Sequence, residues 1–238
     1  MNLLNFRLGW VRYMTDIGTF GHIDTILSKR EAKKQLFRST IVESAVKLFS
    51  KKGIKNTAIA DIMKDAGLGI GTFYNYFESK DDLLRNLLIQ LAVSIRQYTM
   101  RMLHEKKTQG EVLEAMTLYS ADMLERNRFL MPLFMTAVDK NAFSHNGNIV
   151  KKPLPFKDLF NEVIMDGQRR GEFRKDVPSE IITEMFHAMF QTASFSSLPL
   201  RYQDNVRYKL KIVLSGIVVD REAYRPKSEE ESEDKAEK

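Results

Sequence analysis

The spacing of apolar side chains predicts short helices in the first third of the chain. Two apolar stripes at helical spacing predict two helices, and they consist of Phe37, Ile41, Ala45, Leu48 and Phe49, then Ile59, Ile62, Met63 and Ala66. Gly53 and Gly67 end these helices, and residues 72–77 form a third helical segment after a glycine-containing turn. A short helix, a tight turn and another short helix predict a helix-turn-helix, whose second helix enters the major groove of DNA.

Helical spacing continues through the rest of the chain. The stripe from Leu84 to Met102 predicts a long helix that ends near His104. Further helices are expected from about Val112, around Pro132 to about Lys140, from Pro155 to Gly171, from Pro178, and from about Asp204 to Asp220, with a loop over 141–153. Because no alternating strand pattern of any length occurs, the predicted fold is all-α. It has an N-terminal three-helix domain over 29–80 and a larger C-terminal helical domain over 81–225.

The two ends of the chain differ from these domains. Residues 1–28 contain scattered aromatic side chains without a clear period, and two interpretations stay open. Met14 is an alternative translation start, or the segment is an irregular N-terminal extension that packs on the domain or reaches toward DNA. Residues 226–238 are predicted to be a disordered acidic tail, because six acids and three lysines crowd the twelve residues from Lys227 onward.

The third helical segment has a composition that suits contact with DNA. Phe73 and Phe77 stand four residues apart and are expected to anchor it to the first two helices. Its other faces carry Ile70, Gly71, Thr72, Tyr74, Asn75 and Tyr76. The threonine, the two tyrosines and the asparagine donate to phosphate oxygens, and asparagine also pairs with adenine. Ser79 and Asp82 then form a capping box that opens the long helix, with Lys80 beside it. The alternative is a small helical domain with exposed aromatic side chains.

A family resemblance favours DNA binding. The stretch GLGIGTFYNYFESKDDLL is similar, almost position for position, to the signature G-V-S-x-G-T-[LIF]-Y-x-[YH]-F-x-[SN]-K-x-x-L of the TetR family of transcriptional regulators. The resemblance covers about residues 38–83, roughly a fifth of the chain, and the motif is highly specific. It implies double-stranded DNA with a palindromic operator as the partner.

The resemblance also implies roles for single residues. Thr57 matches the threonine that caps the family's second helix. Positions that usually touch the DNA backbone are matched by Thr72, Tyr74, Tyr76 and Lys80, and positions that face bases by Ile70, Gly71 and Asn75. Two departures concern the operator: Ala58 replaces a frequent second threonine, and Ile70 stands where a polar or basic residue is frequent. Because Ile70 meets a thymine methyl but forms no hydrogen bond, the operator sequence does not follow from the resemblance.

Charge and composition narrow the function further. The net charge is +6, and residues 28–85 hold twelve basic against seven acidic side chains, as expected of a domain that faces phosphate. With no cysteine, thiolate zinc sites and disulfides are excluded, and a cytoplasmic location is expected. No apolar run is long enough for a membrane span. The four histidines are isolated, and neither a P-loop nor a G-x-S-x-G motif occurs, so we expect no enzyme, no metal and no cofactor.

The C-terminal domain is rich in methionine and phenylalanine, which suits an adaptable apolar pocket. In the resembling family this region binds small effectors. The residues expected at such a pocket are Tyr98, Met102, Met116, Tyr119, Met123, Phe134, Phe160, Met185 and Met189. We expect a small hydrophobic effector of aromatic or acyl character, and the alternative is that these side chains are simply core.

The last two helices are apolar over a broad arc, which indicates a second burial partner. In the resembling family these helices pair with their copies in a dimer, and a two-fold dimer suits a palindromic site. The residues expected at the interface are Ile182, Phe186, Phe190, Leu210, Val213, Leu214 and Ile217. The alternative is that both faces are buried within one chain.

These observations predict a dimeric, sequence-specific transcriptional regulator, most simply a repressor that a small hydrophobic effector releases from its operator. The alternative from another functional class is a TetR-like DNA-binding protein without an effector, which organises chromosomes or is controlled by a protein partner.

Overall fold

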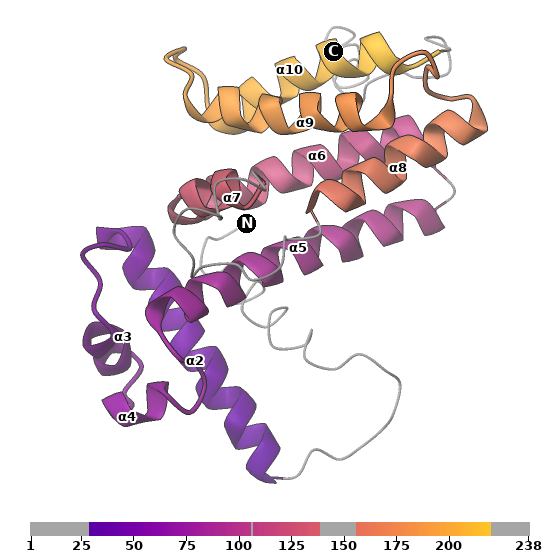
Figure 1. Cartoon of the computed structure of the whole chain (residues 1–238). Helices are drawn as coiled ribbons and strands as arrows, with labels where there is room; N and C mark the ends of the chain where they lie inside the picture. The colour runs from indigo at the N-terminus through magenta and orange to yellow at the C-terminus, as the bar shows by residue number, and fades with distance from the viewer. Residues whose placement is uncertain (1–28, 106, 139–155, 220–238) are drawn as a thin grey trace, which may run out of the picture. The chain divides into compact units, whose positions relative to one another are not determined.

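The computed structural model describes residues 29–105, 107–138 and 156–219, and within these ranges the fold is helical (Figure 1). No strand occurs in the described ranges, where β-pairing is confined to an isolated bridge between Phe173 and Val218. The predicted all-α class is therefore confirmed. The expectations for residues 1–28, for the loop over 141–153 and for the acidic tail lie outside the described residues.

The described helices fall into two compact units, with the boundary between Gln90 and Leu91. The N-terminal unit contains α2 (Lys29–Lys52), α3 (Ile59–Asp65), α4 (Ile70–Phe73) and the first part of α5 (Lys80–His104). The C-terminal unit contains the rest of α5 and then α6 (Gln109–Arg126), the 3₁₀ turn η1 (Arg128–Leu130), α7 (Met131–Val138), α8 (Phe156–Arg170), α9 (Ser179–Ser194) and α10 (Tyr202–Ile217).

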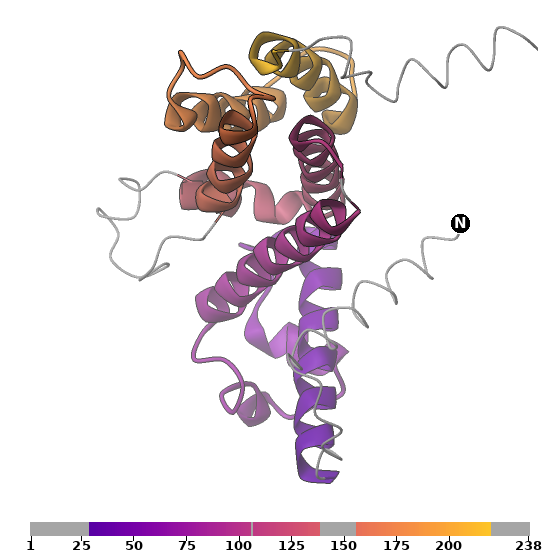
Figure 2. The same cartoon turned by 90° about the vertical axis from the view of Figure 1, so that its right-hand side faces the viewer.

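In the N-terminal unit, α3 packs beside α2 and α4 packs against α3 (Figures 1 and 2). Its core consists of the apolar faces predicted for these helices, with Ile41, Ala45, Phe49, Ile62, Met63, Phe73 and Phe77 fully or almost fully buried. Gly53 and Gly67 have φ angles of 77° and 67°, which favour glycine, and each reverses the chain after a helix. The helix-turn-helix is thus held by a small continuous core.

The start of α3 corrects one expectation. Ala58, not Thr57, is the N-cap residue, and the side chain of Ala58 has no group that accepts a hydrogen bond. The Thr57 side chain is buried, and its hydroxyl donates a 2.8 Å hydrogen bond to the carbonyl oxygen of Gly53. Asp61 supplies the local cap instead, because its carboxylate accepts from the amide of Ala58 at 3.2 Å. Thr57 therefore stabilises the connection between α2 and α3 from inside, and its expected place on the DNA-contacting surface is wrong for this conformation.

The start of α5 has the predicted cap. The Ser79 hydroxyl accepts a hydrogen bond from the amide of Asp82 at 3.1 Å. In return the Asp82 carboxylate accepts from the amide of Glu78 at 3.1 Å, one residue before the reciprocal partner of a standard capping box. The helix-opening signal read from the sequence is confirmed.

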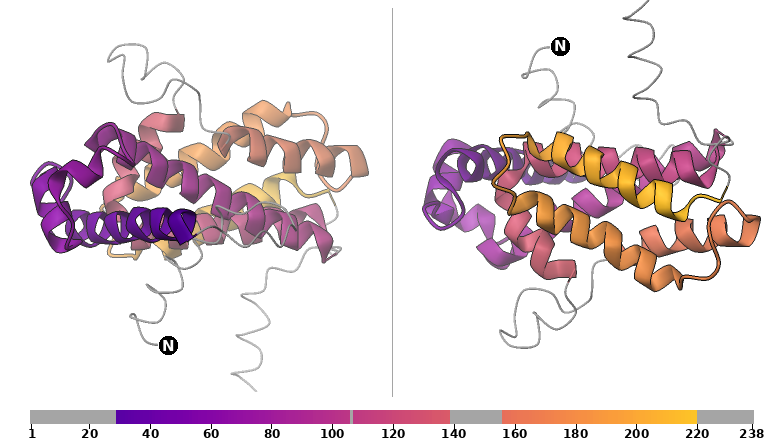
Figure 3. Two further views of the ribbon diagram at one scale, coloured as in Figure 1. Left: turned by 90° about the horizontal axis from the view of Figure 1, so that it is seen from below. Right: turned by 90° about the horizontal axis from the view of Figure 1, so that it is seen from above.

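In the C-terminal unit, α9 and α10 lie side by side, α8 packs against α9, and α6 packs against α8 and α10 (Figure 3). The turn after α8 is held closely: Phe173 packs directly on Gly167, and the amide of Arg174 donates to the carbonyl of Ile217 at 2.8 Å. This contact fixes the chain between α8 and α9 against the end of α10. The observed bounds of α8 and α10 and the observed start of α9 lie within a few residues of the predicted ones.

Candidate nucleic-acid interface and C-terminal sites

The short helix α4 presents an exposed face and a buried face. Phe73 and Phe77 are buried, with ring centroids 5.6 Å apart, so they anchor the segment as predicted. On the opposite side Ile70 is 54% exposed and Tyr74 59% exposed, and Gly71 and Asn75 are exposed as well. The exposed Ile70 of α4 and the exposed Tyr74 directly after it form a surface that suits contact with another molecule.

The backbone continues the turn beyond α4, so the neighbouring polar side chains follow the same surface. The amide of Asn75 donates to the carbonyl of Thr72 at 3.2 Å, and that of Tyr76 donates to the carbonyl of Phe73 at 2.9 Å. Thr72 and Tyr76 are half-buried. The Tyr74 ring stands edge-on to Phe73, with centroids 5.5 Å apart, which restricts the direction of its hydroxyl.

Gly71 is not required by the fold of the chain itself. A Cβ added at this position would meet nothing within 4 Å, and the backbone lies outside the left-handed region that favours glycine. Open space next to an exposed helix is where the backbone of this chain is able to approach a ligand closely.

Lys80 has a role that its sequence position did not indicate. Its Nζ donates to the carbonyl oxygens of Ile54 and Thr57, at 3.0 and 3.1 Å. The lysine thereby ties the start of α5 to the connection between α2 and α3. In the described conformation two of its three N–H groups donate hydrogen bonds within the chain. The third N–H group is left for the predicted contact with a phosphate.

Arg38 is a further contributor that the sequence did not single out. Its Nη2 donates to Asn86 Oδ1 at 2.8 Å, and its guanidinium lies 5.4 Å from the centroid of the Phe77 ring. Burial lowers the pKa of Arg38, and the negative charge of Asp82 opposes this shift. Arg38 thus supports the buried ring that anchors α4. The sequence feature that could have indicated this role is the position of Arg38 on the apolar side of α2.

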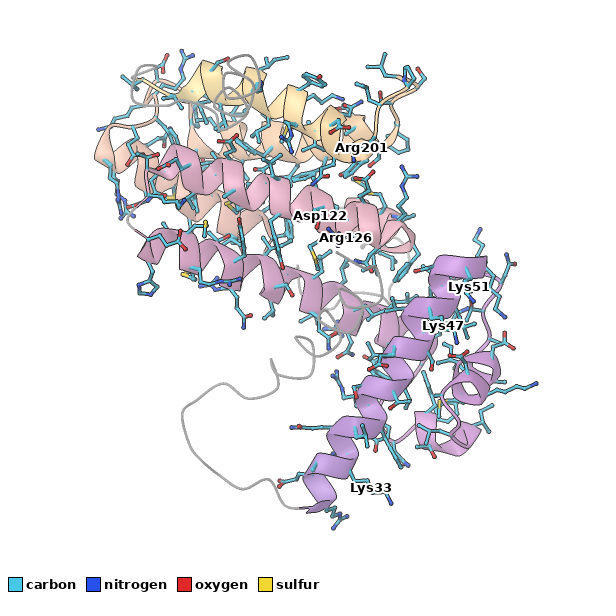
Figure 4. All side chains as sticks on the ribbon, turned by 180° about the vertical axis from the view of Figure 1, so that it is seen from behind. Lys33, Lys47, Lys51, Asp122, Arg126 and Arg201 are labelled. Carbon is cyan, nitrogen blue, oxygen red and sulfur yellow. The ribbon has the colours of Figure 1, made fainter. Side chains whose placement is uncertain are left out.

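Positive charge lies along α2, where Lys33, Lys47 and Lys51 are labelled in Figure 4. Two lysines are engaged in ion pairs with α3: Lys47 with Asp65 at 2.5 Å and Lys52 with Asp61 at 2.8 Å. The hydrogen bonds from these lysines hold the pKa of each aspartate below its usual value. These pairs fasten α3 to α2 and leave Lys51 as exposed charge on the same unit.

In the C-terminal unit the residues expected at an effector pocket occupy three different environments. The Tyr98 and Tyr119 rings stack with centroids 4.3 Å apart and are half-buried, as is Met102. Met116, Met123, Phe134, Phe160 and Met189 are buried. Met185 is 47% exposed on α9 and thus does not share the buried environment of the others.

A cluster of aromatic rings connects α7, α8 and α9. Phe134 stands edge-on to Phe156 at 4.8 Å, and Phe160 contacts Phe156, Phe186 and Phe190 at centroid distances of 5.8, 5.6 and 6.2 Å. The His187 ring is also in contact with Phe160, at 5.9 Å. We call these six side chains the aromatic cluster. The sequence indicated Phe134 and Phe160 as pocket residues, but it gave no signal that the rings of α9 meet them.

The residues expected at the dimer interface are buried within the chain. Ile182, Phe186, Phe190, Leu210, Val213, Leu214 and Ile217 are each at most 9% exposed. They face the helices of their own unit, so they are core residues and their assignment as interface contacts is wrong.

The same two helices nevertheless present a different apolar surface. Ile181 and Met185 are exposed on α9, and Phe195, which directly follows this helix, is exposed as well. Tyr208 and Ile212 are exposed on α10, the latter to 72%. We call these five residues the α9–α10 stripe. The second burial partner indicated by the broad apolar arc would therefore cover this stripe.

A helix-turn-helix with an exposed second helix defines a DNA-binding domain. Residues 41–87 match the model of the bacterial regulatory proteins of the TetR family. The N-terminal domain is thus similar to the DNA-binding domain of the TetR family, and the resemblance seen in its motif is confirmed.

Known proteins that are similar to a larger part of the chain include regulators of this family. The HTH-type transcriptional repressor KstR2 of Rhodococcus jostii is 25% identical over 149 residues, which cover 60% of this chain and 71% of that protein. The structure of Thermus thermophilus FadR in complex with lauroyl-CoA is 24% identical, with a TM-score of 0.55 over 77% of this chain and 96% of that one. The complex of SmeT, a repressor of Stenotrophomonas maltophilia, with triclosan is 18% identical, with a TM-score of 0.62 over 80% of this chain and 95% of that one. These structures share the fold of the chain.

No helix in the described ranges is both long and apolar enough to cross a membrane.

Proposed function

We propose that this chain is a dimeric transcriptional repressor that binds a palindromic operator through α4 and is released by a small hydrophobic effector. The observation that carries the proposal is the exposed face of α4, with Ile70, Tyr74 and Asn75, in a domain that matches a family of regulatory proteins. Tyr74 and Asn75 offer donors to phosphate and to base edges, and Ile70 offers an apolar contact for a thymine methyl. Gly71 leaves room for the DNA backbone. Thr72, Tyr76 and the free donor of Lys80 are assigned to phosphates at the rim.

The α9–α10 stripe supports a dimer. Two adjacent helices that each expose large apolar side chains bury them efficiently against their own copies across a two-fold axis. A two-fold dimer carries two α4 helices, which matches the two half-sites of a palindrome. In this proposal Ile181, Met185 and Ile212 take the place of the core residues first expected at the interface.

The effector part of the proposal rests on the C-terminal unit. Its tyrosine stack, its buried methionines and its aromatic cluster provide an apolar and adaptable interior. Two proteins of the same fold are described with ligands that contain an apolar part, lauroyl-CoA and triclosan. Because α5 begins in the N-terminal unit and ends in the C-terminal one, ligand binding near α5 would shift the population between operator-binding and released forms. The proposed location is the cytoplasm, with no enzymatic activity and no cofactor.

Selection of binding sites from random duplex DNA, with the purified full-length chain near physiological salt, tests the DNA-binding part. We expect an enriched palindrome. The matched background is the double variant Tyr74→Ala, Asn75→Ala, which keeps the buried anchors Phe73 and Phe77 and should enrich nothing. Binding by both proteins without any enriched sequence, and with strong salt dependence, would show that the chain grips the phosphate backbone only, and the repressor proposal would fall.

Sedimentation of stripe variants tests the dimer. Ile212→Asp places a charge in the proposed interface and should give a monomer at micromolar concentration. Ile89→Asp is the control, because Ile89 is an exposed isoleucine of α5 outside the stripe. If both variants remain dimers, the chain uses a different interface.

The second candidate function is a DNA-binding protein without an effector. The observation that favours it is that five of the nine residues expected at the pocket are buried, as in an ordinary core. Spreading of the protein along DNA without any response to apolar compounds would favour this candidate over the repressor.

A further inference from the structure

His187 is a buried polar side chain in apolar surroundings. It lies on the face of α9 that also carries Phe186 and Phe190, and it is 7% exposed. Its ring meets the ring of Phe160, on α8, at 5.9 Å and an interplanar angle of 60°. Among the described residues neither Nδ1 nor Nε2 has a hydrogen-bond partner. Buried polar groups in folded proteins normally have such partners, so an exception of this kind points to a ligand.

The electrostatic surroundings of His187 determine the protonation state of its ring. Burial, and after it the positive charge of Lys157, lowers the pKa of His187 to about 4, and the Thr183 carbonyl opposes this shift without meeting hydrogen-bond geometry. The imidazole is therefore neutral at pH 7, with one N–H donor and one acceptor nitrogen. It offers a hydrogen bond inside an apolar cluster without introducing a buried charge.

The chemistry of the ligand follows from this arrangement. The rings of Phe156, Phe160 and Phe186 suit an apolar chain or an aromatic body. The positive potential of Lys157 at His187 favours an electron-rich group of the ligand over a cation. A carbonyl or carboxylate oxygen meets both conditions, because it accepts from the N–H group and is attracted by the lysine.

We propose that His187 is a binding residue for an acyl ligand, whose oxygen accepts a hydrogen bond from the imidazole while its apolar body lies among the aromatic cluster. This assignment rests on the proposed effector function and gives it a ligand class and a residue. It also explains why a histidine stands at this position, although a phenylalanine would suit the apolar surroundings better.

Three variants of the full-length chain test the proposal. His187→Phe keeps an aromatic ring and removes both nitrogens, and His187→Gln keeps a hydrogen-bond donor. Thr117→Val is the control, because Thr117 is equally buried but its hydroxyl already donates to the Leu113 carbonyl at 2.6 Å. The probes are laurate and methyl laurate, and the measurements are the melting temperature without ligand, the dissociation constant by calorimetry, and release of selected operator DNA.

We expect opposite effects on stability and binding. Without ligand, His187→Phe should raise the melting temperature, and Thr117→Val should lower it, because only the latter loses a satisfied hydrogen bond. His187→Phe should weaken binding of the probes about tenfold, His187→Gln should recover part of the loss, and Thr117→Val should leave it unchanged. Equal binding of laurate and methyl laurate would identify the carbonyl as the anchored group, and preference for laurate would identify the carboxylate.

Three results would overturn the assignment. They are a lower melting temperature of ligand-free His187→Phe, unchanged binding by that variant, or absence of binding of both probes to the unaltered chain. Failure of the proposed repressor function looks different: laurate would still bind in a His187-dependent manner, but operator DNA would not be released.

Discussion

Next to α4 the polar side chains of the N-terminal unit have partners within the chain, whereas in the aromatic cluster of the C-terminal unit His187 has none among the described residues. Thr57 donates to Gly53, and Lys80 donates to the carbonyls of Ile54 and Thr57. His187 is surrounded by rings, and both of its nitrogens lack hydrogen bonds in the described structure. The polar side chains behind α4 and the histidine of the aromatic cluster therefore differ in whether their hydrogen bonds are satisfied within the described structure.

The difference has a functional meaning. A surface that reads DNA needs a fixed geometry, and satisfied hydrogen bonds behind α4 provide it. A site that responds to a ligand gains from a polar group whose hydrogen bond is completed only when the ligand arrives. In this interpretation hydrogen bonds hold the N-terminal unit in one arrangement. In the C-terminal unit His187 lacks a hydrogen-bond partner, and an effector is able to supply one.

Removal of a buried anchor in the N-terminal unit should have the largest effect. Phe77→Ala deletes a ring that is 1% exposed and that supports Arg38, and we expect a loss of about 3–5 kcal/mol of unfolding free energy together with DNA binding. Denaturant unfolding of the full chain measures this loss. Tyr74→Ala is the control on the exposed face of the same segment, and it should lose DNA binding with little change in stability. Similar unfolding curves for both variants would contradict the distinction between anchor and contact.

Acid should destabilise the two units in different pH ranges. Because the pKa of His187 is lowered to about 4 in the folded chain, the unfolded chain binds more protons between about 4 and 6.5, and stability falls as the pH drops through this range. The loss amounts to at most about 3 kcal/mol. In the N-terminal unit the pKa values of Asp61 and Asp65 are lowered in the folded chain. The stability that these two ion-paired carboxylates contribute is therefore lost only below this pH range, as they become protonated.

Denaturant unfolding at pH 7 and at pH 4.5 measures the effect of His187. His187→Phe removes the titrating group, so its stability should change less between these two values than that of the unaltered chain. An equal change in both proteins would show that other groups control the acid response.

The two units also differ in how well the sequence predicts them. In residues 70–77 the spacing of Phe73 and Phe77 separates buried from exposed positions without ambiguity, and the structure agrees. In α9 the apolar residues occur as adjacent pairs, such as Ile181 with Ile182 and Met185 with Phe186. Periodicity does not decide which member of such a pair faces the core, because packing against α8 and α10 decides it. On α9, Ile182 and Phe186 were therefore expected at the interface, whereas the exposed members of these two pairs are Ile181 and Met185.

A similar limit applies at Thr57. A threonine before an apolar helical stripe is a good cap signal, but here the helix begins one residue later and Asp61 supplies the cap. The bond from Thr57 to Gly53 depends on the path of the turn after α2, which local sequence does not specify.

Replacement of a glycine by alanine should also affect stability differently in the two units, by a smaller amount. A Cβ at Gly167 would lie 2.2 Å from Cδ2 of Phe173, so Gly167→Ala should cost about 1–3 kcal/mol through overpacking. Gly71→Ala meets open space and should leave the stability nearly unchanged, although it lies on the proposed DNA surface. Thermal unfolding of both variants measures the difference. Combination with Phe173→Leu should relieve part of the strain of Gly167→Ala, and additive losses in the double variant would show that this contact is not its source.

The smallest effects should separate base reading from backbone contact within the exposed face of α4. Asn75→Ala should weaken binding to the selected operator by about 1–3 kcal/mol and tolerate substitutions at one base pair, because asparagine pairs with a single base edge. Tyr74→Phe removes one hydroxyl donor and should weaken binding by about 1 kcal/mol on every sequence alike. Titration of both variants against the operator and its single-base substitutions separates the two patterns. Both side chains are exposed, so neither substitution should unfold the chain and lower DNA binding in that way. A uniform loss with Asn75→Ala would move that residue from base reading to the phosphate backbone.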